Sequence, residues 1–343
     1  MKAMQTLAAL LLGSALSAGT MPQSQAADHI KPDHIKDGIV TSMGGLPNFI
    51  GKEKGFFAEE GIDTEIVFFD AAQPIAIAVA SGDIDFGTTG LTAAFFNLAQ
   101  QGTLRMLGSG TWEHPTFQSI GFLVSNQAYA GGLHSLKDIA GHKAGITQSG
   151  TPLQYAIALA AKKYDIDYSK LPIVLLQSNP NVGTALTGNQ VDFATQTVVP
   201  AYDVIKKGGA KLLGWQGDEL PPQQNEMLFT STKLVNDKAE LLTRYMRAYR
   251  KSMAYIHDAF ADANDKRRDG ANADEVMNIA AKYLKQPVAQ LKEGVPFFST
   301  DGRIDEDNVA TLMAWYKSQG MIKGDIAADA LIDKRDAKLV SAK

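Results

Sequence analysis

One short phrase occurs twice in the chain and constrains its fold more than any other feature. Residues 81–89 read SGDIDFGTT, and residues 187–196 read TGNQVDFATQ. In both copies an apolar stretch ends at a small residue near a glycine, and an apolar-Asp-Phe triplet and a Thr-containing segment follow. Gly just past a helix is a common C-terminal cap. The phrase therefore predicts a helix, a short buried strand and a loop at the strand's C-terminal end.

Two such units indicate two similar lobes. Ligands of open α/β sheets bind in the crevice outside the C-terminal ends of the strands, so each lobe offers a loop to a shared cleft. Strand-like and helix-like segments alternate from 37 to about 215, as a mainly parallel sheet flanked by helices requires. Two further apolar segments, 120–124 and 226–230, are interpreted as strands that cross between the lobes. We assign 27–117 and 226–343, with C-terminal helices, to lobe 1 and 118–225 to lobe 2.

The first 26 residues have the pattern of a secretory signal peptide. Lys2 precedes an apolar stretch at 7–12, and Ser24-Gln25-Ala26 fits the small-x-small cleavage rule. The apolar stretch is too short to span a membrane. The chain contains no Cys, hence no lipid attachment point, and we expect it to be periplasmic.

Composition excludes several functional classes. Without Cys, a thiol nucleophile, a thiolate metal site and a disulfide are all unavailable. The formal net charge is −4, and Arg105 is the only arginine before Arg244, which argues against nucleic-acid binding. The sequence also lacks the G-x-S-x-G, H-E-x-x-H and P-loop motifs of common enzymes. We expect no enzymatic activity, no catalytic residues, no metal and no cofactor.

Three motifs together resemble a known family. GFFAEEGI occupies 55–62, GDIDFG occupies 82–87 and LKDIAGHK occupies 136–143. They are similar to the periplasmic substrate-binding proteins of ABC importers, in the group for nitrate, sulfonate, taurine and thiamin-pyrimidine precursors (NMT1/THI5-like and SsuA/TauA-like proteins). The resemblance covers about 37–255. It implies the α/β two-lobe periplasmic binding protein fold (type II, with two crossing strands) and a non-enzymatic role in transport.

One stretch departs from the family pattern. Many members have an aromatic-rich segment that ends in Glu-Pro after the second Asp-Phe strand. Here residues 194–200 read ATQTVVP, which keeps the Pro and lacks the Trp and Glu. A ligand cannot therefore be carried over from the family to this chain.

The candidate ligand-binding residues lie in loops expected at the cleft. Hydroxyls and backbone N–H groups before a helix can hold an anion, glycines allow close approach of the backbone, loop amides orient polar ligands, and Trp at a cleft mouth supplies apolar area and a donor. The candidates are Ser42, Met43, Gly44, Gln73, Thr88, Thr89, Trp112, His114, Ser149, Gly150, Thr151, Thr195, Gln196 and Trp215. Asp85 and Asp192 are interpreted as structural, because an Asp at a strand end can fix loops through backbone N–H groups.

The functional hypothesis is a periplasmic receptor that closes by hinge motion around a small organic anion, a sulfonate or a carboxylate, and is monomeric. It would pass the ligand to a membrane permease with an ATPase. No Arg falls in the expected cleft loops, so helix N-termini, hydroxyls and amides would hold the anion. Alternatives are a pyrimidine or thiamin-precursor binding protein, a related enzyme on the same fold, or a receptor that feeds a separate sensor.

Overall fold

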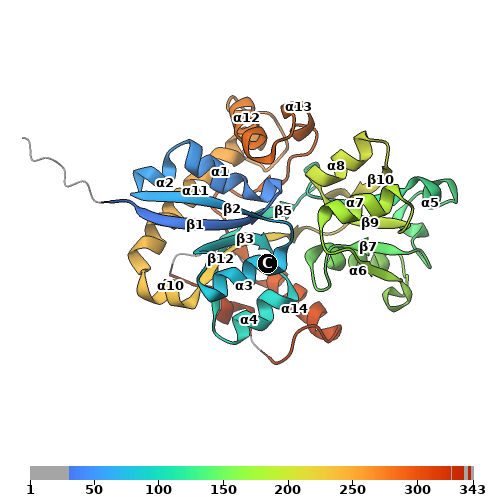
Figure 1. Ribbon diagram of the computed structural model, residues 1–343, viewed down its shortest axis with the longest axis horizontal. Helices are drawn as coiled ribbons and strands as arrows, with labels where there is room; N and C mark the ends of the chain where they lie inside the picture. The colour runs from blue at the N-terminus through green and yellow to red at the C-terminus, as the bar shows by residue number, and fades with distance from the viewer. Residues whose placement is uncertain (1–30, 326, 336–338, 341–343) are drawn as a thin grey trace, which may run out of the picture. The chain divides into compact units, whose positions relative to one another are not determined.

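A computed structural model describes residues 31–325, 327–335 and 339–340 of the chain. The predicted signal peptide, 1–26, lies outside these described residues. From Pro32 onward the chain forms one compact unit built on two five-stranded sheets (Figure 1).

The first sheet has the strand order β2-β1-β3-β12-β4. β1 pairs in parallel with β2 and β3, whereas β12 is antiparallel to both of its neighbours, β3 and β4. The bounds are β1 Asp33–Val40, β2 Ile62–Phe69, β3 Phe86–Gly90, β4 Leu104–Ser109 and β12 Glu226–Ser231. Strand β12 thus returns to the first sheet from a distant part of the chain.

The second sheet has the order β10-β6-β9-β7-β8 and a similar mixture of directions. β7 is parallel to β8 and β9, and β6 is antiparallel to β9 and β10. The bounds are β6 Ile120–Ser125, β7 Ala144–Ile146, β8 Ile173–Leu175, β9 Phe193–Thr197 and β10 Ala210–Trp215. Each sheet therefore contains a parallel part, as the sequence predicts.

Helices cover the sheets and bury the apolar cores between them (Figure 1). One hydrophobic cluster joins the first sheet to α1, α2 and α11, a second joins it to α3, α4 and α14, and a third lies between the second sheet and α6. The helices are α1 Leu46–Glu53, α2 Phe56–Glu59, α3 Ala72–Ser81, α4 Ala93–Gln100, α5 Asn126–Ala130, α6 Pro152–Lys163, α7 Asn179–Thr187, α8 Val198–Lys206, α9 Gln216–Glu219, α10 Thr232–Asp237, α11 Ala239–Phe260, α12 Ala273–Leu284, α13 Val288–Leu291 and α14 Glu306–Ser318.

The chain passes twice between the two sheets. On the way out it forms β5 (Thr111–Glu113), and on the way back it forms β11 (Gln223–Gln224), which pairs antiparallel with β5. A third short strand, β13 (Phe297–Phe298), completes this small sheet. Segments 120–124 and 226–230, predicted as crossing strands, are instead inner strands of the second and the first sheet, because each pairs with a neighbour on both of its edges. We propose that the two large sheets are the cores of the predicted lobes, 27–117 with 226–343 and 118–225.

The repeated phrase marks the start of a strand in each sheet, and this corrects the expected position of the Thr residues. β3 begins at Phe86 and β9 at Phe193, so the Thr residues after each Asp-Phe lie within the strand. The Asp stands just before the strand because its carboxylate accepts a backbone N–H instead of pointing into the core. Asp85 accepts from Lys36 at 2.9 Å and Asp192 from Lys143 at 2.8 Å. The structural role predicted for both Asp residues is confirmed.

Replacing Asp85 with Ala is expected to lower the free energy of unfolding by about 1–3 kcal/mol, because it leaves a partly buried N–H without its acceptor. Urea unfolding measures the change. Asp83→Ala is the matched control, since Asp83 is exposed and accepts from the Ser81 hydroxyl. An equal loss in the two variants would contradict the role given to Asp85.

Candidate functional site

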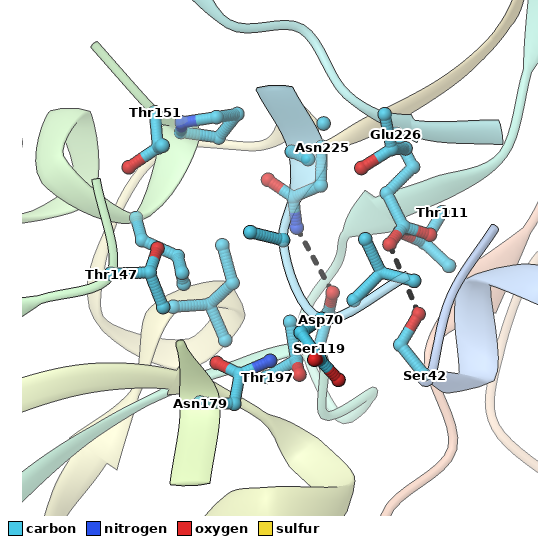
Figure 2. Close-up of a pocket in the computed structure, with 18 residues that line it drawn as sticks. Ser42, Asp70, Thr111, Ser119, Thr147, Thr151, Asn179, Thr197, Asn225 and Glu226 are labelled. Carbon is cyan, nitrogen blue, oxygen red and sulfur yellow. Dashed lines mark hydrogen bonds between the residues drawn. The ribbon is translucent and has the colours of Figure 1, made fainter. Parts of the chain in front are cut away.

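A cavity of about 70 Å³ lies between the two sheets and is lined by residues of both (Figure 2). Its volume is enough for on the order of five water molecules. The lining consists of Val40, Ser42, Asp70, Ala71, Ala72, Thr89, Gly90, Thr111, Ser119, Ile120, Thr147, Thr151, Pro152, Leu153, Asn179, Thr197, Asn225 and Glu226.

A wider hollow of about 760 Å³ adjoins the cavity. The two spaces share Val40, Asp70 and Asn179 in their linings. The remaining lining of the hollow comes mainly from α7, α8 and the end of α12. The cavity is thus the narrow inner part of a larger groove.

Strand ends and helix starts bring the polar side chains to the cavity. Thr89 lies near the end of β3, Thr147 directly follows β7, and Thr197 ends β9. Thr151 caps α6, where its hydroxyl accepts the N–H of Gln154 at 3.3 Å. This arrangement follows from the general rule that the carboxyl ends of parallel strands and the N-termini of the following helices meet at one edge of a sheet.

The charged side chains of the cavity are both acidic. Asp70 and Glu226 belong to the lining, and none of the eighteen lining residues, all within the described part of the chain, is Lys or Arg. Hydroxyls and amides make up the rest of the polar surface. The lining therefore offers carboxylate acceptors but no cationic hydrogen-bond donor.

Glu226 is the first residue of β12 and is held by two hydroxyls. Its carboxylate accepts from the Ser42 hydroxyl at 3.3 Å and from the Thr111 hydroxyl at 3.2 Å. It also lies so close to Gly44 that a Cβ at that position would overlap it. Burial raises the pKa of Glu226 to about 7, because removal from water disfavours the charged form.

Asn225, the residue before Glu226, has a side-chain amide whose nitrogen is hydrogen-bonded and whose oxygen is not. Its nitrogen donates to the Ser119 hydroxyl at 3.0 Å and to the carboxylate of Glu113, and Figure 2 shows the side-chain oxygen on the opposite side from Ser119. Among the described residues this buried oxygen has no hydrogen-bond partner. Glu113 also accepts the Ile120 N–H at 3.1 Å, and burial raises its pKa to about 8.

Of the fourteen residues predicted to bind ligand, three line the cavity: Ser42, Thr89 and Thr151. Met43 and Gly44 form the short 3₁₀ turn that follows Ser42.

Three predicted residues lie directly behind the cavity wall. The Thr88 hydroxyl contacts the Asn48 side chain at 3.5 Å, and the Thr195 hydroxyl donates to the Leu153 carbonyl at 2.9 Å. Gln196 donates to the Asn179 carbonyl at 2.8 Å. All three side chains are buried, and the last two contact residues that line the cavity, so they are placed to support the wall.

Gln73, Ser149 and Gly150 take part in hydrogen bonds beside the cavity. These bonds connect helices that cover the first sheet to the loop that precedes α6. The Gln73 side chain donates to the Ser149 carbonyl at 2.9 Å, and the Ala93 N–H donates to the Gly150 carbonyl at 2.8 Å. Gly150 has a φ of 68°, which favours glycine, and a side chain there would press on Ala93. This loop thus joins α3 and α4 to the start of α6.

The predicted aromatic candidates do not line the cavity. The Trp112 indole donates to the Ser109 hydroxyl at 3.2 Å, and His114 stacks on Phe297 with ring centroids 4.7 Å apart. Trp215 is buried and packs on Tyr202 with centroids 5.3 Å apart. The rings of Trp112 and His114 pack around the small sheet, and that of Trp215 packs beside the second sheet.

Several residues that line the cavity were not among the predicted ones, although some of them carry the same sequence signal as those that were. Asp70, Thr147 and Thr197 stand at strand ends, so the rule that selected Ser42 applies to them as well. The sequence gives no comparable signal for Asn225 and Glu226, because they reach the cavity from the segment in which the chain returns from the second sheet to the first.

The described residues, 31–325, 327–335 and 339–340, also bear on metal binding and membrane insertion. Groups of three or more His, Asp or Glu able to hold a metal ion do not occur within that part of the chain. Its helices include none with the length and hydropathy needed to cross a bilayer.

Solved structures of binding proteins share this fold. The alkanesulfonate-binding protein SsuA from Xanthomonas axonopodis pv. citri bound to MOPS has a TM-score of 0.69 at 16% identity, with 91% of this chain and 99% of that chain covered. The ligand-binding component of an ABC-type import system from Staphylococcus aureus with zinc bound has a TM-score of 0.71 at 15% identity, covering 88% and 96%. The periplasmic nitrate-binding protein NrtA from Synechocystis PCC 6803 has a TM-score of 0.68 at 13% identity, covering 89% and 87%.

These likenesses establish the two-lobe periplasmic binding protein fold. No curated protein sequence matches the chain. The NMT1/THI5-like family model, in contrast, matches residues 45–263, which is more than half of the chain. The predicted resemblance is confirmed: the chain belongs to the NMT1/THI5-like family.

Proposed function

We propose that this protein is the periplasmic solute receptor of an ABC importer. It binds a small organic molecule in the cavity between the two sheets and delivers it to a permease with an ATPase, as a monomer and without chemical conversion. The observation that carries the proposal is the cavity itself, a space at the strand ends that both sheets line and into which hydroxyl, amide and carboxylate side chains are brought. Such sites between two lobes are suited to capture by hinge closure.

Polar contacts on two sides of the site support closure. On one side, Gln73 donates to the Ser149 carbonyl at 2.9 Å. On the other, Tyr202 of α8 donates to the Glu293 carbonyl at 2.9 Å, and Lys206 lies 2.8 Å from the Glu293 carboxylate. Such contacts can break and re-form at low cost, which a receptor that opens for each ligand requires.

The anionic ligand predicted from the sequence finds support on the second sheet's side of the cavity. Three helices, α6, α7 and α8, begin there, near Thr151, Asn179 and Thr197. Helix N-termini favour negative charge through their free N–H groups and dipoles. A sulfonate or carboxylate would therefore be oriented toward these helices.

The test is a thermal-shift screen of the protein after unfolding and refolding, which removes any retained ligand. The panel holds sulfonates, nitrate, aliphatic and aromatic carboxylates, and pyrimidines. A ligand at 100 times its dissociation constant should add about 2.7 kcal/mol to the free energy of unfolding. We expect the midpoint to rise by roughly 4 °C for one class of compounds. Silence across the whole panel, or turnover of the stabilising compound, would contradict the proposal.

A further inference from the structure

The two crossings between the sheets, residues 110–119 and 216–225, contain a cluster of buried polar side chains. Each member of the cluster is at most 5% exposed, and the members are Glu113, Ser119, Gln216, Gln223 and Asn225. Hinges are the few segments that absorb the rotation of one part of a protein against another. The contacts of these side chains therefore affect how freely the two sheets can move.

Glu113 connects the two crossings to each other and to the second sheet. Its Oε1 atom accepts the N–H of Ile120, the first residue of β6, at 3.1 Å, and it also accepts from the Asn225 side chain. Asn225 donates to Ser119 as well (Figure 2). Gln223 stands opposite Glu113 in the β5–β11 pairing, so both side chains project from the same face. A change in the angle between the sheets therefore alters the contacts of this one carboxyl group.

Several polar atoms of this cluster have no hydrogen-bond partner among the described residues. The acceptors are Glu113 Oε2, Gln216 Oε1 and Asn225 Oδ1, and the donor is Gln223 Nε2. Gln216 and Gln223 share one hydrogen bond of 2.7 Å through their other ends. Buried acceptors without a donor cost free energy. A proton on Glu113 makes its carboxyl group a donor and so reduces the excess of acceptors.

The surroundings of Glu113 favour its protonated form. Apart from burial, the groups that act on it most strongly are neutral hydrogen-bond donors: the side chains of Asn225 and Ser119 and the N–H groups of Ile120 and Gly217. Burial outweighs these donors and raises the pKa of Glu113 to about 8. The titratable groups on the elements around it each have a partner of their own: His114, Asp218, Glu219, Glu226, Tyr249 and His257.

We propose that Glu113 is a proton-dependent latch of the hinge. With its proton, the carboxyl group holds the crossings in the arrangement described above. Without it, the buried charge draws water into the crossings, and the two sheets separate more readily. A proton that binds one arrangement more tightly stabilises that arrangement, so a rise in pH favours opening. The inference rests on the proposed receptor role in one respect, namely that opening exposes the cavity to its solute.

Infrared spectroscopy detects the proton directly, because the carbonyl band of a protonated carboxyl group is separate from the bands of a carboxylate. Exposed acids are ionised at pH 6, but burial also raises the pKa of Asp37 and of Glu226 to about 7, so the spectrum of Glu113→Gln is subtracted. We expect the difference to contain the protonated band at pH 6 and to lose it with a midpoint near pH 8. A difference that contains only carboxylate bands at pH 6 would overturn the proposal.

A pair of spin labels measures the opening. The chain contains no Cys, so labels attach only at introduced positions. Lys207, which caps α8, and Gln286, which follows α12, both line the wider hollow, and the labels are placed by Lys207→Cys and Gln286→Cys. Pulsed EPR without any solute should give a longer mean distance at pH 9 than at pH 6. In Glu113→Gln, which keeps the shape and a permanent donor, the distance should stay at its pH 6 value.

Two further variants in the labelled protein assign the response. Glu219→Gln is the matched control, because Glu219 is an acid of α9 that is only partly buried and pairs with Lys163. Glu226→Gln removes the buried carboxyl group that follows the return crossing. Both should keep the lengthening between pH 6 and pH 9. Loss of the response in Glu226→Gln would assign it to the cavity and contradict the latch.

The outcomes separate the latch from the receptor role. A wild-type distance that stays constant with pH, or one that changes equally in Glu113→Gln, contradicts the latch and leaves the receptor role untouched. The wild-type series needs no variant at position 113, so it decides the matter even if that substitution impairs folding. A silent thermal-shift panel contradicts the receptor role, whereas the pH response of the hinge is measured without a solute and stands on its own.

Discussion

Replacing Gly44 with Ala is expected to lower affinity for the solute by at least about 100-fold. The added methyl group would occupy the space of the Glu226 carboxylate, so that side chain must move out of its place between Ser42 and Thr111. A factor of 100 corresponds to about 2.7 kcal/mol, which is comparable to the loss of one hydrogen bond to a charged group.

The same substitution is expected to reduce the free energy of unfolding by about 1–3 kcal/mol, the usual cost of overpacking. Gly44 is buried in the turn after Ser42. Backbone strain is not the cause, because Gly44 is not among the residues with positive φ. The steric conflict with Glu226 alone should account for the effect.

Two variants check this explanation for Gly44. Gly131→Ala is the matched control, because a Cβ at Gly131 meets its nearest atom at an ordinary 3.4 Å. The double variant Gly44→Ala with Glu226→Ala should recover part of the lost stability, since the conflict is removed. Unchanged affinity in Gly44→Ala would show that the position of Glu226 is irrelevant to binding, and a double variant less stable than the sum of the single changes would contradict the steric cause.

The fold was predictable to a large extent because its signals are local. Helix α6, for example, begins at Pro152 because Thr151 caps it and Pro suits the first turn, and both residue types can be read from the sequence. The repeated phrase correctly indicated two related sheets, and its Asp residues make equivalent hydrogen bonds in both. The limits of β3 and β9 were less predictable, because pairing with their neighbours extends them through the Thr residues.

The cavity was predictable only where it follows from strand order. Ser42, Thr89 and Thr151 stand in loops or strand ends that any parallel sheet directs to one edge. Asn225 and Glu226 depend on a long-range event, the return of the chain to the first sheet as β12. The local sequence there, a polar pair before an apolar run, gives no sign of that pairing.

The same local signals selected the aromatic candidates, which do not line the cavity. Trp112 and Trp215 do stand near the points where the chain leaves a sheet, but each found a packing partner there. A sequence shows that a Trp is near a crossing and not which side of the strand it occupies. The choice between cavity and packing is made by neighbours that are remote in the chain.

The free energy of unfolding is expected to fall by at least about 3 kcal/mol between pH 5 and pH 8. Three carboxyl groups carry this effect, and desolvation is the main cause for each. Burial raises the pKa of Asp37 and of Glu226 to about 7 and that of Glu113 to about 8. One pKa unit corresponds to about 1.4 kcal/mol, so a single group shifted by two to three units suffices.

The sign follows from proton binding. In the unfolded chain these groups ionise near pH 4, whereas in the folded protein they keep their protons up to about pH 7 or 8. Between these limits the folded state binds more protons, so stability falls as pH rises. Groups with lowered pKa act in another window: Glu53 and Glu60, paired with Lys282 and Arg247, lose their contribution below about pH 4.5.

Urea unfolding at pH 5, 6, 7 and 8 measures the slope, and single variants assign it. Glu113→Gln and Glu226→Gln should each flatten the curve and should stabilise the protein at pH 8 relative to the wild type. His34→Gln is the control: its raised pKa acts in the same direction, but His34 is exposed and solvent screens its pairs with Asp63 and Glu65. A wild-type curve that is level or rises from pH 5 to pH 8 would mean that the three carboxyls are ionised in the folded protein, held charged by their hydrogen-bond donors in spite of burial.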